Sequence, residues 1–146
     1  MIGLIQRVTQ ASVVVDHQEI ASIHSGILLL LGVERQDSKQ QAERLLQRVI
    51  TYRIFEDKTG RMNKSLLNTQ GELLIVPQFT LPADTNKGTR PSFTPAAPPD
   101  LGKQLFNYFL QQAKNKLGKV QQGKFGADMQ VSLINNGPVT FWLQCC

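Results

Sequence analysis

Five consecutive residues, Pro77-Gln-Phe-Thr-Leu81, carry the groups in this sequence that are best suited to chemistry. Gln78 offers a hydrogen-bond donor and an acceptor, Thr80 offers a hydroxyl, and the backbone amides of Phe79 and Thr80 could bind an oxyanion. The block follows an apolar run, so it stands where a buried strand enters a loop, and strand ends hold such groups rigidly. The alternative is a strand end whose polar groups only cap the backbone. Spacing alone favours that alternative.

A second segment, Asn135-Asn-Gly-Pro138, places a conformationally free glycine before a proline, where cis peptide bonds are common. A cis Gly137-Pro138 bond would aim two successive carbonyl oxygens in nearly the same direction. On the residues alone, an ordinary hairpin turn is the simpler interpretation.

The usual catalytic signatures are absent from the sequence: it has no GxGxxG, Walker loop, GxSxG elbow or HExxH. His17 and His24 lie near a turn between early strands, and we expect exposed or edge-strand imidazoles rather than a catalytic base. The adjacent Cys145 and Cys146 can neither join distant segments nor form a spaced metal site, and we expect a frayed, reduced tail. The sequence therefore predicts no metal and no cofactor, and an enzyme here must work without the usual base.

Strands and two helices must position these segments. Apolar runs and alternation predict the strands Ile2–Val8, Ser12–Val15, Glu19–Ile23, Ile27–Val33, Glu72–Val76 and Val139–Gln144. A capping box at Ser38 predicts a helix to about Tyr52, and an apolar stripe predicts a second helix from Leu101 to Leu117. Residues 82–99 show little periodicity and predict a long loop, a common place for function.

The expected fold class is mixed α/β: one strand-rich domain of residues 1–146, with two main helices packed on β-sheet layers. Consecutive strands can pair directly, which argues against a doubly wound parallel sheet. Lys and Arg total 16 against 11 Asp and Glu, a net charge of +5 that suits a polyanionic partner such as nucleic acid. No apolar run is long enough for a signal peptide or a membrane span, so we expect a cytosolic protein without a membrane partner.

From end to end, the sequence resembles the D-aminoacyl-tRNA deacylases, the D-tyrosyl-tRNA(Tyr) deacylase family. The resemblance rests on an ordered series of segments: MIGLIQRVTQASV, LLLLGVE, RVITYRIFEDKTGRMN, QFTL, DTNKGTRPSF and GADMQVSLINNGPVTFWLQ. It implies a cytosolic homodimer without cofactor. The implied activity is that of a carboxylic ester hydrolase, which splits D-aminoacyl-tRNA, and mischarged glycyl-tRNA, into free amino acid and tRNA.

The resemblance also implies roles for the QFTL block. Gln78 and the Phe79 amide would lie near the scissile ester, with the terminal 2′-hydroxyl of the tRNA assisting hydrolysis. Thr80 has been considered a nucleophile in such proteins, but we expect it to line the site, as Leu81 does. The family usually has Ser where this chain has Pro77, so a hydroxyl contact and a backbone donor are lost there.

The remaining site residues implied by the resemblance come from the C-terminal third. Gly137-Pro138, as a cis motif, would reach into the partner subunit's site and exclude an L side chain, while a D side chain points outward. Phe125 and Met129 would help to form the pocket for the terminal adenosine. The competing hypothesis is a non-catalytic nucleic-acid-binding module on the same fold. A serine-type esterase of small molecules lacks an organised base.

Overall fold

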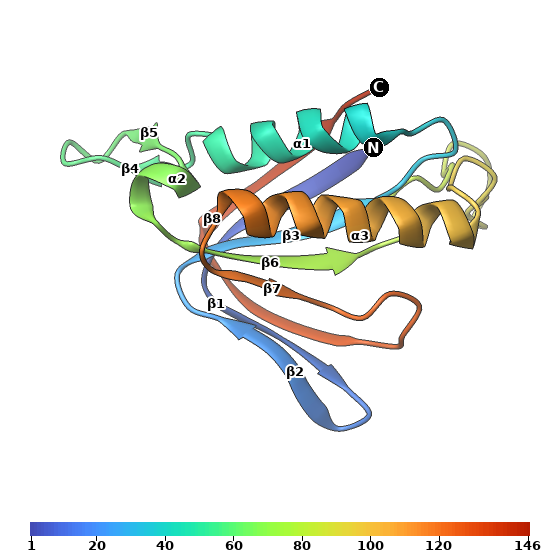
Figure 1. Ribbon diagram of the computed structural model, residues 1–146, viewed down its shortest axis with the longest axis horizontal. Helices are drawn as coiled ribbons and strands as arrows, with labels where there is room; N and C mark the ends of the chain where they lie inside the picture. Colours follow the sequence, from blue (N-terminus) through green and yellow to red (C-terminus); the bar gives the residue numbers. More distant parts are fainter.

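The computed structural model describes residues 1–146 and contains one six-stranded sheet, a two-stranded hairpin and three helices (Figure 1). The elements in chain order are β1 Ile2–Val15, β2 Gln18–Ile23, β3 Gly26–Gly32, α1 Lys39–Thr51, β4 Phe55–Glu56, β5 Met62–Lys64, α2 Leu66–Thr69, β6 Glu72–Pro77, α3 Pro99–Lys116, β7 Val120–Gln122 and β8 Gln130–Gln144.

The sheet is mixed, with the strand order β2-β1-β3-β6-β7 and with β8 along the other edge of β1. β1 pairs antiparallel with β2, β3 and β8, because consecutive strands return through short turns. β3, β6 and β7 run parallel, since the connections between them cross over through α1 and α3. The prediction that early strands pair directly is confirmed.

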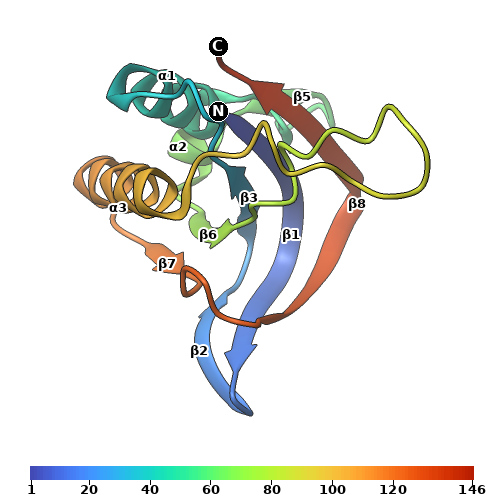
Figure 2. The ribbon, with the colours of Figure 1, turned by 90° about the vertical axis from the view of Figure 1, so that its right-hand side faces the viewer.

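Helices α1 and α3 contact each other and cover one face of the sheet (Figure 2). The capping box that begins α1 is present: the Ser38 backbone N–H donates to Gln41 Oε1 at 2.9 Å, and Ser38 Oγ accepts from the Gln40 amide at 3.2 Å. The predicted apolar stripe of α3 is buried against the sheet. Both helix predictions are confirmed, and the short helix α2 was not predicted.

A second apolar cluster lies where the sheet curls on itself. Side chains alternate along a strand, so Leu28, Leu74 and Val76 point away from the helices. They pack with residues of β1 and β2, with Met129 just before β8 and with Val131, one residue after the start of that strand. The segment before β8 is therefore held against the end of β6, where the candidate site begins.

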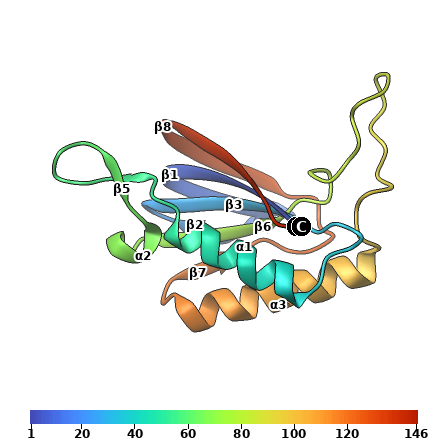
Figure 3. The same ribbon diagram turned by 90° about the horizontal axis from the view of Figure 1, so that it is seen from above.

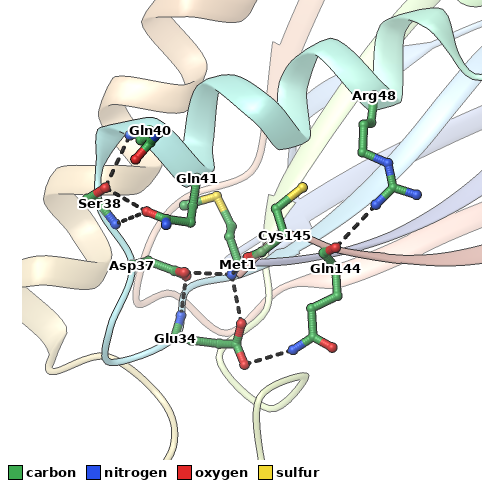
Figure 4. A network of polar contacts seen from close by, with 9 residues as sticks. All are labelled: Met1, Glu34, Asp37, Ser38, Gln40, Gln41, Arg48, Gln144 and Cys145. Carbon is green, nitrogen blue, oxygen red and sulfur yellow. Dashed lines mark hydrogen bonds and ion pairs between the residues drawn. The ribbon is translucent and has the colours of Figure 1, made fainter.

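The ends of the chain meet in a buried polar network (Figure 4). The α-amino group of Met1 donates to Asp37 Oδ1 at 2.6 Å and to Glu34 Oε2 at 2.7 Å. It also donates to the carbonyl of Cys145 at 2.7 Å, and the Cys145 amide donates to the Met1 carbonyl at 2.9 Å. The expected frayed tail is therefore wrong for Cys145, which is buried, although both thiols are free and Cys146 is exposed.

Two further predictions are corrected by strand pairing. The two strands predicted within residues 2–15 are one strand, β1, because the exposed Gln10 and the residues after it continue the pairing with β8. Likewise, Asn135–Pro138 is not a turn between strands, because it lies within β8 as an irregularity opposite β1. Residues 55–64 form the β4–β5 hairpin, which projects from the body (Figure 3). No helix in the structure has the length and apolar character needed to cross a bilayer.

Candidate active site

The turn after β6 presents two backbone donors without acceptors. Gln78 ends the ladder, since its amide donates to the Leu31 carbonyl of β3 at 2.8 Å. The next two amides, of Phe79 and Thr80, have no hydrogen-bond acceptor within the chain. Both residues are exposed, so these two successive donors at a strand end are open to a ligand and can hydrogen-bond a negatively charged oxygen.

Pro77 fits the last position of β6 without disturbing the sheet. Because Gln78 donates toward β3, the preceding residue faces the β7 side. β7 has already ended there, since its last residue, Gln122, pairs with Ile75. A proline is therefore tolerated at this position, at the margin of the ladder.

The side chains of Gln78 and Thr80 bond to each other, with Gln78 Nε2 donating to Thr80 Oγ1. No imidazole, carboxylate or amine contacts the Thr80 hydroxyl. His17 and His24 are both exposed, as predicted, and His24 lies beside Glu72 at the opposite end of β6. That is about 20 Å from Gln78 for six residues of strand. The hydroxyl thus has no base to activate it as a nucleophile.

A largely apolar cleft of about 680 Å³ opens beside this turn, with Gln78, Phe79, Phe125 and Met129 among its lining residues. Phe125 packs against Phe106 of α3, with ring centroids 6.0 Å apart, and it lies over Gly102, where a Cβ would come within 3.3 Å of its ring. Four of the predicted site residues therefore share one cleft.

Met129 is fixed by the segment between β7 and β8. Its sulfur accepts from the Lys124 amide at 3.4 Å and lies 2.8 Å from the place a Cβ on Gly123 would occupy. The same Cβ would lie 3.3 Å from Pro77 Cδ, so Met129 and the end of β6 are packed around a position with little room for a side chain.

Thr80 and Leu81 do not line the cleft. Leu81 covers the end of β3 instead, because a Cβ at Gly32 would come within 2.9 Å of Leu81 Cβ. The expectation that Leu81 lines the site finds no support in the structure of this single chain. It holds the turn against the sheet.

Gly137 and Pro138, joined by a cis peptide bond, lie in a bulge of β8. Val8 pairs with Asn135 and Gln6 with Thr140, so Asn136–Val139 stands opposite Arg7 alone. Within the bulge, the Val139 amide donates to Asn135 Oδ1 at 2.8 Å.

Arg7 supports the bulge from β1. Its side chain is buried, with Nε donating to the Asn136 carbonyl at 2.9 Å and Nη1 to the Ile54 carbonyl at 2.7 Å. Gly137 has φ +143°, and a Cβ there would lie 2.5 Å from Val139 Cγ2 and 3.2 Å from Arg7 Nη2. Sequence reasoning missed Arg7, because a lone arginine in a strand pattern gives no sign of what it holds.

The bulge does not line the cleft of its own chain. Gly3 of β1 pairs with Leu31, next to the site, whereas Arg7 pairs with Ile27. The bulge is thus about 13 Å farther along the strands, for four residues. It lies on the far side of β1 from β6.

Two more residues at the mouth of the cleft were not predicted as site residues. Phe93, in the loop from Pro82 to Pro98, packs against Phe79 with ring centroids 5.4 Å apart, and Arg35 also lines the cleft. The RPSF segment contains Phe93, but loop residues lack a periodic signal that would place them.

The two side chains with shifted pKa values lie away from the candidate site. Hydrogen bonds from the Thr59 hydroxyl and Asn63 lower the pKa of Asp57 in the β4–β5 turn, and the hydrogen bond to Glu43 raises the pKa of Tyr108 on α3. Neither group contacts the turn after β6, so the candidate site depends on backbone donors rather than on a titrating side chain.

Comparison with known proteins assigns the family. The chain matches the D-Tyr-tRNA(Tyr) deacylase family over residues 4–144. The chain belongs to this family. It is 60% identical over 144 residues to a protein of Nitrosococcus oceani named D-aminoacyl-tRNA deacylase, covering 99% of this chain and 93% of the relative. A protein of the same name from Janthinobacterium sp. (strain Marseille) is 55% identical, with 99% and 97% covered. The resemblance inferred from the motifs is confirmed, and the chain is an enzyme of this family.

Two solved structures share the fold. One, the c-Myc DNA Unwinding Element Binding Protein, is 38% identical with a TM-score of 0.96, covering 100% of this chain and 99% of that one. The other, described as a "probable eukaryotic D-amino acid tRNA deacylase", is 15% identical with a TM-score of 0.82 and covers 97% of both chains. These similarities confirm the mixed α/β fold class.

Proposed function

We propose that this protein hydrolyses the ester bond between a D-amino acid and tRNA, releasing free D-amino acid and tRNA. The observation that carries the proposal is the unpartnered amide of Phe79, a residue that lines the apolar cleft, followed in the same turn by the unpartnered amide of Thr80, in a chain of the deacylase family. Aminoacyl-tRNA is a cytosolic substrate, and we assign the protein to the cytosol.

In this mechanism water attacks the ester carbonyl, and the oxygen that becomes negative accepts hydrogen bonds from the two free amides. The bond to the ribose oxygen then breaks, and that oxygen receives the proton given up by the water, with the neighbouring 2′-hydroxyl as relay. Gln78 orients the ester through its side-chain amide. Phe125 and Met129, which line the apolar cleft, hold the terminal adenosine. Thr80 positions Gln78 through their shared hydrogen bond.

Chiral selection comes, in this proposal, from Gly137-Pro138 of a second copy of the chain. Support comes from β8, whose outer edge has no strand partner and which exposes Ile134, Phe141 and Trp142. A long unpaired edge with large apolar side chains is an association surface. The bulge does not line the cleft of its own chain, so a second copy would supply it, and its carbonyls would exclude an L side chain.

The decisive experiment compares D-tyrosyl-, L-tyrosyl- and glycyl-tRNA as substrates. We expect rapid release of D-tyrosine, some release of glycine and scarcely any of L-tyrosine. Equal rates for the two tyrosyl enantiomers would rule out chiral selection by Gly137-Pro138. Release of no amino acid from any of the three substrates would rule out the deacylase activity.

A mixing experiment tests whether Gly137-Pro138 of one subunit completes the site of the other subunit. Chains with Gln78→Ala and chains with Gly137→Ala are each expected to lose activity. Their heterodimers contain one site free of both changes and should recover part of it. Heterodimers that form without recovering activity would show that each site is built within one chain.

A second candidate function is DNA binding without catalysis, because the 38% identical relative with a solved structure is named a DNA-unwinding-element binding protein. The net charge of +5 suits either nucleic acid. Binding of duplex DNA by a chain that releases no amino acid from any aminoacyl-tRNA would favour this function over the first.

A further inference from the structure

We propose that the mouth of the cleft is a second nucleotide site, in which Phe79 and Phe93 stack the penultimate base of the tRNA and Arg35 pairs with the phosphate that joins it to the terminal adenosine. This inference rests on the proposed function, since it extends the same substrate by one nucleotide. It explains three side chains that the hydrolytic mechanism does not use.

The two aromatic rings are exposed where a folded chain normally hides them. Phe79 is 63% exposed and Phe93 is 44% exposed, yet they contact each other at 5.4 Å with their planes tilted by 50°. Both line the cleft. Exposed rings in a nucleic-acid enzyme serve as stacking platforms, because every base has a flat apolar face.

The position of Phe93 is fixed by the base of its loop. Asp84 and Ser92 exchange backbone hydrogen bonds of 2.8 and 2.9 Å, which close the loop immediately before Phe93. After it, the Ala96 amide donates to the Phe93 carbonyl at 3.0 Å. The ring is therefore presented by an anchored segment, although the tip of the loop extends away from the body (Figure 2).

Arg35 is held in place without being neutralised. Its Nε donates to the Thr94 carbonyl at 2.9 Å, and its own amide donates to the Pro95 carbonyl at 3.0 Å. The only ion pairs in the structure are those of the Met1 amino group, so the guanidinium has no carboxylate partner. An exposed guanidinium with one backbone hydrogen bond and no carboxylate partner, beside two aromatic rings, fits a nucleotide, with its flat base and its phosphate, better than the apolar face of a protein.

The geometry also fits the direction of the substrate. In the proposed function, the terminal adenosine lies against Phe125 and Met129 inside the cleft, and the nucleotide before it must leave through the mouth. The aminoacyl end of tRNA is single-stranded, so its penultimate base is free to stack on protein side chains.

Binding of three small ligands separates the parts of this site. The ligands are adenosine, the methyl ester of adenosine 5′-phosphate and the dinucleotide cytidylyl-(3′→5′)-adenosine, each titrated by calorimetry or NMR. Going from adenosine to the methyl ester adds the phosphodiester, and going from the methyl ester to the dinucleotide adds the second nucleoside with its base. We expect each step to tighten binding, the second by about 5- to 150-fold, the range for one stacked base.

Phe93→Ala should remove the gain from the added base, whereas Phe93→Trp should keep it. Arg35→Ala should remove the gain from the phosphodiester and its salt dependence. Leu67→Ala and Arg44→Ala are matched controls, because both residues are exposed and lie outside the cleft, and neither should change either gain.

The proposal is overturned if the dinucleotide binds no more tightly than the methyl ester, or if Phe93→Ala keeps the difference. It is also overturned if Phe93→Ala dissociates a dimer, which would assign the rings to a protein interface. Because these titrations require no hydrolysis, they decide the subsite separately from the deacylation assay that decides the function.

Discussion

Replacing Arg7 by methionine tests whether the β8 bulge is a positioned part of the site. The variant keeps the length and apolar stem of the side chain but loses the hydrogen bonds to the Asn136 and Ile54 carbonyls, of 2.9 and 2.7 Å. The bulge would then be held only by contacts within β8, such as that from the Val139 amide to Asn135 Oδ1.

The expected loss of stability follows from the two hydrogen bonds. A hydrogen bond to a charged group contributes about 1.5–3 kcal/mol. The bond to Ile54 is buried and should contribute in full, whereas water replaces much of the partly buried bond to Asn136. We therefore expect the free energy of unfolding to fall by about 2–4 kcal/mol, which leaves a domain of ordinary stability folded.

The assay is urea denaturation together with the ratio of D-tyrosyl- to L-tyrosyl-tRNA hydrolysis. We expect that ratio to fall for Arg7→Met, because the Gly137-Pro138 carbonyls lose their fixed direction. Arg48→Met is the matched control: Arg48 is exposed and donates one hydrogen bond, of 3.2 Å, to the Gln144 carbonyl at the other end of β8. It should change stability by less than about 0.5 kcal/mol. An unchanged enantiomer ratio in a less stable Arg7→Met protein would refute the positioning role.

Gly137→Ala should lower activity, because its Cβ would lie 2.5 Å from Val139 Cγ2 and displace the bulge. Residues 136–138 are exposed, so the cooperative urea transition should be retained, and its loss would contradict this. Asp37→Ala should cost about 3 kcal/mol of unfolding free energy, since it removes a carboxylate 2.6 Å from the buried Met1 amino group; an unchanged urea midpoint would contradict the estimate. Binding of tRNA should weaken steeply with salt. Lys87 is exposed in the loop from Pro82 to Pro98, which follows the candidate site, and Lys87→Ala should reduce the slope of log K against log salt by about 1; an equal slope would exclude Lys87 as a phosphate contact.

Local patterns predicted the elements that depend on neighbouring residues. The capping box at Ser38 and the apolar stripe of α3 need only contacts within a few turns, and both are present. The strand end before Gln78 was likewise predicted from the apolar run of β6. These are the parts of the fold in which sequence spacing and spatial spacing coincide.

The errors came from contacts between distant residues. Asn135–Pro138 has the composition of a turn, but pairing with β1 makes it a bulge within one strand. Cys145 has the composition of a tail, but the amino group of Met1, 144 residues away, holds it in the core. No local propensity carries information about either partner.

The site shows the same division. Local chemistry made Gln78 and Phe79 candidates, although spacing alone favoured a plain strand end until the resemblance was added. Phe125 and Met129 came only from the resemblance, since a methionine on an alternating strand is ordinarily a core residue. Arg35 was missed, because its partner, the Thr94 carbonyl, lies 59 residues away.

A site that uses main-chain donors makes a distinctive prediction about Thr80. Its hydroxyl has no base, whereas its amide has no acceptor within the chain and is one of the two proposed oxyanion donors. Thr80→Val, which deletes the hydroxyl and preserves the amide, should reduce kcat less than tenfold. Replacing the amide by an ester, through incorporation of the α-hydroxy acid at position 80, deletes the donor and should reduce kcat by about 10²–10³, the effect of losing one oxyanion donor. The opposite order, with Thr80→Val inactive and the ester variant active, would make the hydroxyl a nucleophile after all. Because the side chain and the amide belong to the same residue, the two variants compare the roles at one position in one fold.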